Sequence, residues 1–504
     1  MDFLDPQKLR RNQLALLVGY GLITIAIAFT MLVLLYQAVG FGLDKQGKVI
    51  QNGLVFVSSQ PPGSQIYLNG APYKDQTNTK LKLPSGDYNL KITADGYRDW
   101  TQRLTVNGDD VQRFDYPFLF PKVLKSTAVS EYAAPPLFAS QSPDRKWLFV
   151  KPANDAPTLT LYDLRDPKKP VSQEISLPTT VVTAGDGAQT WTAVEWASDN
   201  RHLLVRHDYG LSDALKHEYI VVDRSDPQTS VNVTKAVTLA DGEVLTLFDK
   251  KADRFYAFDA VAGTLRSFAL NGSLTPLSMD HIIAFKSYGS DTLLYVTNTT
   301  STTDKTSAGV HVMLKQGDKT YSVRDLPAGA SDYLLDIAQY SDEWYVIVAA
   351  GNDSAVYLYR NLQDQQLKSS TSLPTPWRRF ALKNPTRVSF SSSAQFIMAQ
   401  SGQEFWVYNA DPEHLRSYHY KTTQPLDEFQ KYAVWMDGSH LTYVSGGKQL
   451  VFDFDYQNVQ SLQAAFPDYL PMFDAEYSLV YSIAPGAKAT VPAALFSTPL
   501  TVQK

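Results

Sequence analysis

The stretch WASDNRHLLV, residues 196–205, decides how most of this chain folds. An apolar segment leads into a turn that contains Asp199, and a second apolar segment follows the turn. Asp and Asn favour tight turns because their side chains accept hydrogen bonds from the backbone that follows them. The stretch therefore predicts a β-hairpin with two buried strands.

The hairpin pattern recurs along the chain. Clear copies are SPDRKWLFV at 142–150 and VWMDGSHLTYV at 434–444. Weaker copies surround Phe255, Leu293, Tyr345, Ile397 and Leu479. With Leu148, Leu203 and Leu441 as the equivalent positions, successive copies lie 38 to 55 residues apart. Repeats of about 40 to 50 residues with several strands each are typical of propeller blades.

The pattern W-x-S-D-x-x-x-L-x-V resembles the blades of TolB-like and related bacterial propellers. Eight copies predict an eight-bladed β-propeller over residues 122–504, and seven blades are the alternative. The last copy is one strand short, whereas the segment Val123–Val129 belongs to no copy. A propeller avoids an open sheet edge by pairing its first and last segments, so we predict that this segment completes the last blade.

A different β pattern occupies residues 53–121. Here QPPGSQIYLNG (60–70) and LPSGDYNLKITADGYRDW (83–100) resemble a PEGA domain, a small β-sandwich of surface and envelope proteins. The segment DQTNT (75–79) departs from the family, which commonly has a Gly and a Thr-Pro there. The resemblance implies contact with the envelope or a carbohydrate layer. The residues themselves are turn formers and core aromatics, which favour a stalk.

The N-terminal segment predicts a membrane anchor. Residues 14–36 form a charge-free apolar run, long enough for a helix to cross a bilayer. Lys8, Arg10 and Arg11 precede this run and favour a cytoplasmic N-terminus over residues 1–13. The linker 37–52 and everything after it are then extracytoplasmic. A cleaved signal peptide is the alternative, because small residues stand at 38–40, but its apolar core is usually shorter.

Composition limits the remaining choices. The chain has 504 residues, a formal net charge of -5 and no cysteine. Without a concentrated basic surface, nucleic acid is not an expected partner. Without cysteine there are no disulfides, thiolate zinc sites, cysteine nucleophiles or lipidated N-terminal cysteine.

Several residue types could carry chemistry, but each has a structural interpretation. We expect Asp144, Asp199 and Asp437 to stabilise turns, since no calcium-loop spacing surrounds them. The tryptophans at 147, 196, 344 and 435 are expected in the core or between blades. The pairs His202 with His207 and His414 with His419 are five residues apart, on opposite faces of a strand, a poor geometry for a shared metal. We therefore assign no catalytic, cofactor-binding or metal-binding residue.

The sequence thus predicts an all-β protein behind a single transmembrane helix, without enzymatic activity. Its expected role is that of a membrane-anchored binding or scaffold protein of the bacterial cell envelope, whose propeller face binds a protein or glycan. The alternative is a propeller hydrolase or lyase whose site is assembled from loops around the central channel. Such a site would draw residues from different blades, so no local motif would reveal it.

Overall fold

The computed structural model describes residues 6–38, 41–43, 49–108, 110–185, 187, 189–211, 215–298, 309–362, 364, 373–412, 415–427, 432–488 and 490–502. These residues divide into two compact units. The first runs to Val123 and includes Val502, and the second is Leu124–Thr501. Each unit is described separately below.

The first unit begins with the helix α1 (Pro6–Ala38), the element predicted over residues 14–36. Within it, Leu14–Leu35 is long and apolar enough to cross a membrane, and none of the apolar window is buried. The hydroxyls of Thr24 and Thr30 donate to the carbonyls of Tyr20 and Ala26 at 2.9 and 2.8 Å. These polar groups are therefore satisfied inside the helix, as an apolar surrounding requires.

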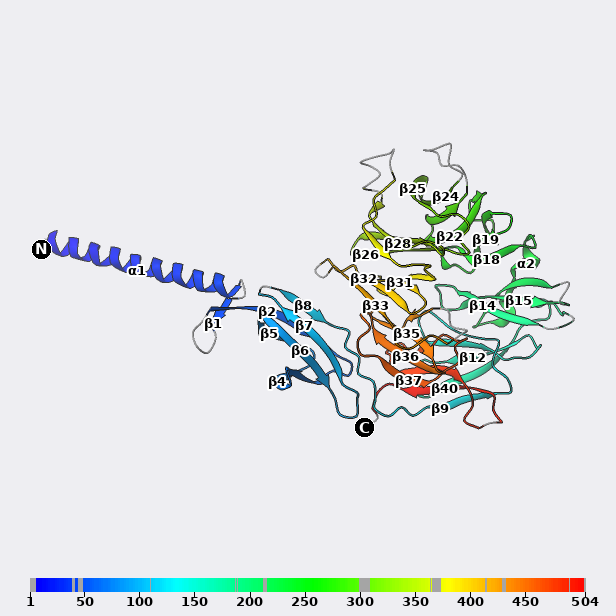
Figure 1. The fold of residues 1–504 in the computed structure, drawn as a ribbon, viewed down its shortest axis with the longest axis horizontal. Coiled ribbons are helices and arrows are strands. Elements are labelled where there is room, and N and C mark those ends of the chain that lie inside the picture. Colours follow the sequence, from blue (N-terminus) through cyan, green and yellow to red (C-terminus); the bar gives the residue numbers. More distant parts are fainter. Residues whose placement is uncertain are drawn as a thin grey trace, which may run out of the picture. The chain divides into compact units, whose positions relative to one another are not determined.

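The rest of the first unit is a sandwich of two sheets, as the PEGA resemblance implied (Figure 1). One sheet contains β1 (Phe41–Leu43), β2 (Val49–Val57), β5 (Thr79–Pro84) and β8 (Val111–Phe114). The other has the order β4 (Ala71–Gln76), β3 (Gln65–Leu68), β6 (Gly86–Thr93) and β7 (Trp100–Val106). Alternate side chains such as Val55, Val57, Leu90, Ile92 and Trp100 meet in one core. This period-two burial is what a two-layer sandwich requires.

Gly96 and Tyr97 form a corner between β6 and β7. Gly96 has φ of 81°, in the left-handed region that a side chain disfavours. Its carbonyl accepts from Lys122 N at 2.8 Å. The hydroxyl of Tyr97 accepts from the backbone N–H of Val502 at 2.8 Å, which is how the C-terminal segment comes to belong to this unit.

The second unit is an eight-bladed β-propeller. Its described residues form eight four-stranded sheets with the same strand order, which Figure 1 shows following one another in chain order from cyan to red. Blade 1 consists of β10 (Phe138–Gln141), β11 (Trp147–Lys151), β12 (Thr158–Asp163) and β13 (Val171–Ser176), and blade 2 consists of β14 (Thr190–Trp196), β15 (His202–Tyr209), β16 (Lys216–Asp223) and β17 (Val231–Asn232). Blade 3 consists of β18 (Glu243–Leu247), β19 (Arg254–Asp259), β20 (Thr264–Ala269) and β21 (Ser278–Met279), and blade 4 consists of β22 (Ile282–Tyr288), β23 (Thr292–Thr297), β24 (Val310–Gln316) and β25 (Lys319–Leu326).

Blade 5 consists of β26 (Tyr333–Tyr340), β27 (Glu343–Ala350), β28 (Ala355–Arg360) and β29 (Arg378–Ala381), and blade 6 consists of β30 (Arg387–Phe390), β31 (Phe396–Ser401), β32 (Glu404–Asn409) and β33 (Arg416–Lys421). Blade 7 consists of β34 (Val434–Trp435), β35 (His440–Ser445), β36 (Lys448–Asp453) and β37 (Gln460–Ala464), and blade 8 consists of β38 (Met472–Phe473), β39 (Leu479–Ala484), β40 (Ala493–Pro499) and β9 (Thr127–Tyr132). All eight repeat positions, from Leu148 to Leu479, lie in the second strand of a blade. The short helices η1 (Pro227–Thr229), α2 (Val233–Ala236) and η2 (Phe248–Lys250) lie in connections.

The predicted ring closure is confirmed, with a correction to its bounds. The closing strand β9 pairs antiparallel with β40, in a register that runs from Ala493↔Tyr132 to Ser497↔Thr127. We predicted Val123–Val129, but Val123 is 72% exposed and belongs to the first unit. The strand therefore starts about four residues later, where the chain enters the propeller.

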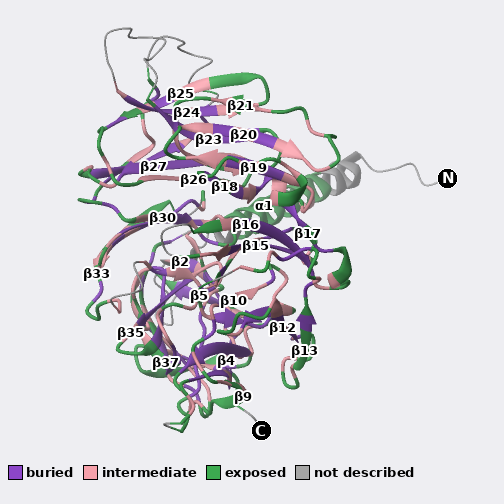
Figure 2. Ribbon diagram, turned by 90° about the vertical axis from the view of Figure 1, so that its right-hand side faces the viewer, coloured by how far each residue is buried: buried purple, intermediate pink, exposed green. Residues whose placement is uncertain are grey.

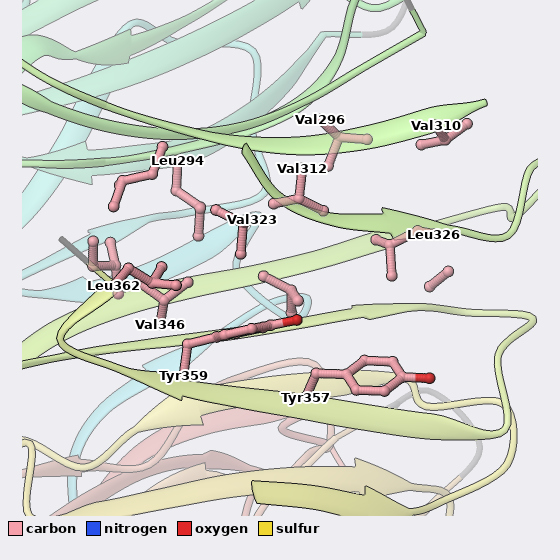
Figure 3. Packing of buried hydrophobic residues seen from close by; sticks show 14 of the residues in the cluster. Leu294, Val296, Val310, Val312, Val323, Leu326, Val346, Tyr357, Tyr359 and Leu362 are labelled. Atoms are coloured by element: carbon pink, nitrogen blue, oxygen red, sulfur yellow. The ribbon is translucent and has the colours of Figure 1, made fainter. Parts of the chain in front are cut away.

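Central strands of the blades are buried on both faces, as Figure 2 shows in purple. In β23 every residue from Thr292 to Thr297 is buried. Neighbouring blades cover both sides of each sheet, so these strands have continuous apolar runs instead of alternation. Figure 3 shows such a core between blades 4 and 5, where Leu294, Val296 and Val312 meet Val346 and Tyr359. This core is the rigid base of the site described next.

Candidate functional site

The first strands of successive blades contact one another, β10 with β14, β14 with β18, β22 with β26 and β26 with β30. They form the inner wall of the ring. Because all blades share one strand order, the turns between first and second strands lie at one end of this wall, which we call the turn end. These turns are residues 142–146, 197–201, 248–253, 289–291, 341–342, 391–395, 436–439 and 474–478.

Carboxylates at the turn end bind backbone amides of the next blade. Glu195 of blade 2 accepts from Leu247 N of blade 3 at 2.9 Å. Asp336 of blade 5 accepts from Phe390 N of blade 6 at 3.2 Å. An innermost strand has a sheet neighbour on one side only, so half of its backbone groups need other partners. Glu195 and Asp336 supply such partners to two backbone amides and thereby join neighbouring blades.

Blade 1 is joined to blades 7 and 8 by other polar contacts at the same end. Gln141 of blade 1 donates its amide to Phe473 O of blade 8 at 2.9 Å. The guanidinium of Arg145 donates to Met436 O of blade 7 at 3.3 Å and lies 4.2 Å from the ring centroid of Tyr477. Side chains of the turn end therefore connect blades across the point where the ring closes.

Two lysines lie beside the joining carboxylates. Lys250 pairs with Glu195, and Lys286 Nζ lies 3.3 Å from Asp336 Oδ1. Their side chains are 59% and 50% exposed. Burial of the ammonium, and then the positive charge of Lys286, lower the pKa of Lys250. The Lys250 side chain is nevertheless largely exposed to water, and the positive charge of Lys286 acts on its ammonium.

An exposed aromatic pair adjoins Lys286. Tyr288, two residues further along β22, is 38% exposed. Its ring meets that of Trp344 edge-to-face, with centroids 5.0 Å apart and an interplanar angle of 76°. Trp344 also packs on the core between blades 4 and 5. Lys286, Asp336, Tyr288 and Trp344 therefore form a mixed charged and aromatic surface on a rigid base.

The aspartates singled out in the sequence have the expected structural role. Asp199 Oδ1 accepts from the backbone N–H groups of Arg201 and His202 at 2.8 and 3.1 Å. Asp437 Oδ1 accepts from Ser439 N and His440 N, both at 2.7 Å. Asp144 accepts from Lys146 N at 3.2 Å. Each carboxylate fixes its own turn.

The tryptophans lie between blades, as expected. Trp196 Nε1 donates to Ser140 Oγ of the preceding blade at 3.0 Å, and Trp435 Nε1 donates to Ser389 Oγ at 3.1 Å. Trp147 lies under the guanidinium of Arg224 from the next blade, 3.8 Å from the ring centroid. Only the fourth, Trp344, takes part in the exposed surface at the turn end.

His202 and His207, five residues apart on β15, have different partners. His202 bonds Asp199, whereas His207 is buried between Glu218 and Gln189 at 2.9 and 3.0 Å. His419 bonds Glu404 at 2.8 Å, and His414 lies outside the described residues. Within the described part of the chain, no three His, Asp or Glu side chains are grouped so that they could hold a metal ion.

The sequence did not identify Glu195, Lys250, Lys286 or Asp336. Their contacts join different blades, so no local motif contains two partners. A usable signal was present, however, because each of Glu195, Lys286 and Asp336 interrupts an otherwise apolar or aromatic inner strand. A charge in such a strand indicates a partner on the neighbouring blade.

Comparison with known proteins identifies one part of the chain. Residues 52–119 match the PEGA domain. No curated protein matches the sequence. Among solved structures, the chain is similar to Hsv2 of Kluyveromyces lactis, with 13% identity, 65% of this chain and 98% of that chain covered, and a TM-score of 0.38.

Two further solved structures have similar values. The dihydro-heme d1 dehydrogenase NirN shares 12% identity over 81% of this chain and 74% of its own, with a TM-score of 0.40. Apo AztD from Citrobacter koseri shares 13% identity over 80% of this chain and 96% of its own, with a TM-score of 0.36.

Proposed function

We propose that this chain is a membrane-anchored binding or scaffold protein of the bacterial cell envelope, whose extracytoplasmic propeller binds a protein or glycan partner. The apolar helix is the observation that carries the proposal. Leu14–Leu35 has a mean hydropathy of 2.3 and none of its apolar window is buried. Exposing such a surface to water costs about 25 cal/mol per Å², so the helix needs an apolar surrounding.

Length and charge support an uncleaved anchor with its N-terminus in the cytoplasm. A run of 22 residues exceeds the apolar core of about 7 to 15 residues in a secretory signal peptide. Lys8, Arg10 and Arg11 precede the apolar run of the helix, and positively charged flanks stay cytoplasmic. The PEGA match at residues 52–119 fits a domain that works outside the cell membrane.

The chemistry of the turn end favours binding over catalysis. Most of its charged groups join blades or fix turns, which ties them to fixed structural partners. Beside the exposed turn residues Asp291 and Asp342, blades 4 and 5 present Lys286, Tyr288 and, in part, Trp344 to water. Aromatic rings beside a charge are typical of recognition surfaces.

The absence of cysteine allows a direct topology experiment. Val261 is 98% exposed on blade 3, so Val261→Cys gives one accessible thiol on the propeller. A membrane-impermeant maleimide should label this variant in intact spheroplasts, and the chain should remain in the membrane pellet after carbonate washing. Labelling only after lysis would contradict the proposed orientation.

Asp2→Cys is the matched control, since it places the thiol before the helix. It should be labelled only after lysis, and the thiol should still be present in the mature chain. A soluble, shortened chain that has lost this thiol would show a cleaved signal peptide instead of an anchor.

A further inference from the structure

We propose that blades 4 and 5 form a binding site for an acidic saccharide at the turn end, in which Tyr288 and Trp344 contact a sugar ring and Lys286 binds its carboxylate. The inference rests on the proposed binding function and names its ligand class. Its residues come from the first strand of blade 4 and from the first two strands of blade 5.

Strand geometry brings the four groups together. Lys286 and Tyr288 are two residues apart on β22, so their side chains leave the same face. Both meet blade 5, Lys286 through Asp336 and Tyr288 through Trp344. One surface therefore carries a cation, a carboxylate and two aromatic rings.

The aromatic pair is rigid and partly open to water. Trp344 packs on the core between blades 4 and 5, and its edge-to-face contact holds Tyr288. Tyr288 nevertheless leaves 38% of its surface exposed. A pyranose ring presents C–H groups on one face, and such a face packs against an aromatic ring. Because both rings are already held in place, binding costs little side-chain entropy.

The ammonium of Lys286 is available to an anion. It has three N–H donors and forms an ion pair with Asp336 Oδ1 at 3.3 Å, and the side chain is 50% exposed. Asp336 keeps backbone partners of its own, Ile337 N at 3.1 Å and Phe390 N at 3.2 Å. Asp336 is therefore held in place even when Lys286 turns toward a ligand.

Lys250 adds a second positive charge at an unfavourable backbone position. Lys250 and the preceding Asp249 have φ of 52° and 53°, in the left-handed region where Gly or Asn is favoured. Strained residues of this kind concentrate at binding sites. Burial and, second to it, the positive charge of Lys286 lower the pKa of Lys250, and a bound anion would oppose both effects.

The carboxylates decide between a saccharide and an acidic peptide. Lys250 and Lys286 are matched by Glu195 and Asp336, so the four groups have no net charge. A densely charged peptide would meet repulsion from both carboxylates. A uronate ring, which has hydroxyls beside its acid group, would instead donate its hydroxyls to them and place its own carboxylate on the lysines. The surface therefore favours a ligand in which every acid group is accompanied by hydroxyls.

Titration of the full chain in detergent micelles tests the proposal with three probes: oligogalacturonate, the uncharged galactose oligomer and oligoglutamate. Calorimetry should show oligogalacturonate binding at least about tenfold more tightly than either other probe. No binding of oligogalacturonate at millimolar concentration would overturn the proposal. Equal binding of oligoglutamate would also overturn it and identify an acidic-peptide surface.

Variants locate the site. Lys286→Ala and Tyr288→Ala should each weaken oligogalacturonate binding about tenfold or more. Lys319→Ala, which removes an exposed lysine on the outer strand of the same blade, is the matched control and should bind normally. Normal binding by both site variants would overturn the proposal. If an alanine variant does not fold, Lys286→Gln is tested in its place. Quenching of Trp fluorescence by oligogalacturonate then measures the affinity, which should again be about tenfold weaker than in the wild type.

These titrations do not depend on membrane orientation. A failed titration with a correct labelling pattern would reject the saccharide while leaving the anchored orientation intact. Binding in micelles, together with labelling of Val261→Cys only after lysis, would support the saccharide site and reject the proposed membrane orientation.

Discussion

Blades 2 and 7 contain the same arrangement of three side chains in different surroundings. In blade 2, His202 Nδ1 lies 2.6 Å from Asp199, and its Nε2 lies 3.4 Å from Asp223. In blade 7, the corresponding distances from His440 are 2.7 Å to Asp437 and 3.3 Å to Asp453. Each histidine faces its second aspartate across neighbouring strands, since His202 pairs with Asp223 and His440 with Asp453.

Burial distinguishes the two arrangements. The side chains of His202 and Asp199 are 24% and 45% exposed, whereas those of His440 and Asp437 are 3% and 17% exposed. Burial opposes a charge on His440, but Asp437 and Asp453 outweigh it and raise the pKa of His440 to about 10. The same local pattern therefore forms a solvent-screened turn in blade 2 and a buried ion pair in blade 7.

Arg201 is the second difference. It donates to Asp223 at 2.8 and 2.5 Å, so the buried carboxylate of blade 2 has another cationic partner. Blade 7 has the uncharged Ser439 at the position before its histidine. The turn of blade 7 therefore depends on its histidine more than that of blade 2 does.

The largest expected effect comes from removing β9, the strand that closes the ring to which both blades belong. A fragment of residues 133–501 lacks β9, which leaves the edge of β40 unpaired. It should aggregate or unfold without cooperativity, because an open apolar edge recruits other chains. The matched control is residues 124–501, which differ by nine residues and should show one cooperative transition in thermal unfolding. A soluble 133–501 fragment of equal stability would refute closure by β9.

Within an intact ring, His440→Ala should be far more damaging than His202→Ala. Removing His440 leaves the buried Asp453 and the mostly buried Asp437 without their cation, which costs about 3 to 5 kcal/mol. Removing the partly exposed His202 should cost about 1 kcal/mol, because Arg201 still neutralises Asp223. Denaturant unfolding of the two variants measures both values, and equal losses would show that burial does not separate the two blades.

The sequence predicted the ring better than the contacts inside it. Hairpin positions such as Leu148 and Leu441 were identifiable because the turn, its Asp and the flanking apolar strands are neighbours in the chain. The closure followed from counting strands in the last repeat. The predicted start of the closing strand, Val123, lies about four residues before the observed start. Val123 is exposed and belongs to the first unit, and the local sequence does not show where that unit ends.

The candidate site was not predictable in the same way. Lys286 and Asp336 are 50 residues apart, and their contact requires two adjacent blades at the correct register. Sequence reasoning likewise treated Asp199 and Asp437 as equal, because both lie three residues before a histidine. Their difference in burial depends on the neighbouring blades, which no local pattern encodes.

The pH dependence of stability should sharpen the contrast between the blades. The folded pKa of His440, about 10, lies above its ordinary value of 6.5, so the folded state retains a proton that the unfolded state loses. The contribution of His440 is fully present below pH 6.5 and is lost as pH rises through about 10. Denaturant unfolding between pH 6 and 10 should show the gap between wild type and His440→Asn narrowing.

The difference between the two proteins is the informative quantity in this measurement. Burial lowers the pKa of Lys151 to about 8, so Lys151 contributes an opposite trend above that pH. The contribution of Lys151 is the same in both proteins and cancels. A gap that stays constant across the range would mean that His440 is neutral in the folded protein.

The smallest expected effect concerns Arg201, whose side chain is 45% exposed. Arg201→Gln should reduce the stability of the folded state less than His440→Ala does, because water and ions screen an exposed guanidinium. Raising the salt concentration should shrink the loss in Arg201→Gln, while the loss in His440→Ala should hardly change, since its ion pairs are buried. Denaturant unfolding at low and high salt compares the two variants. A loss in Arg201→Gln that does not respond to salt would place this arginine with the buried network and remove the distinction between blades 2 and 7.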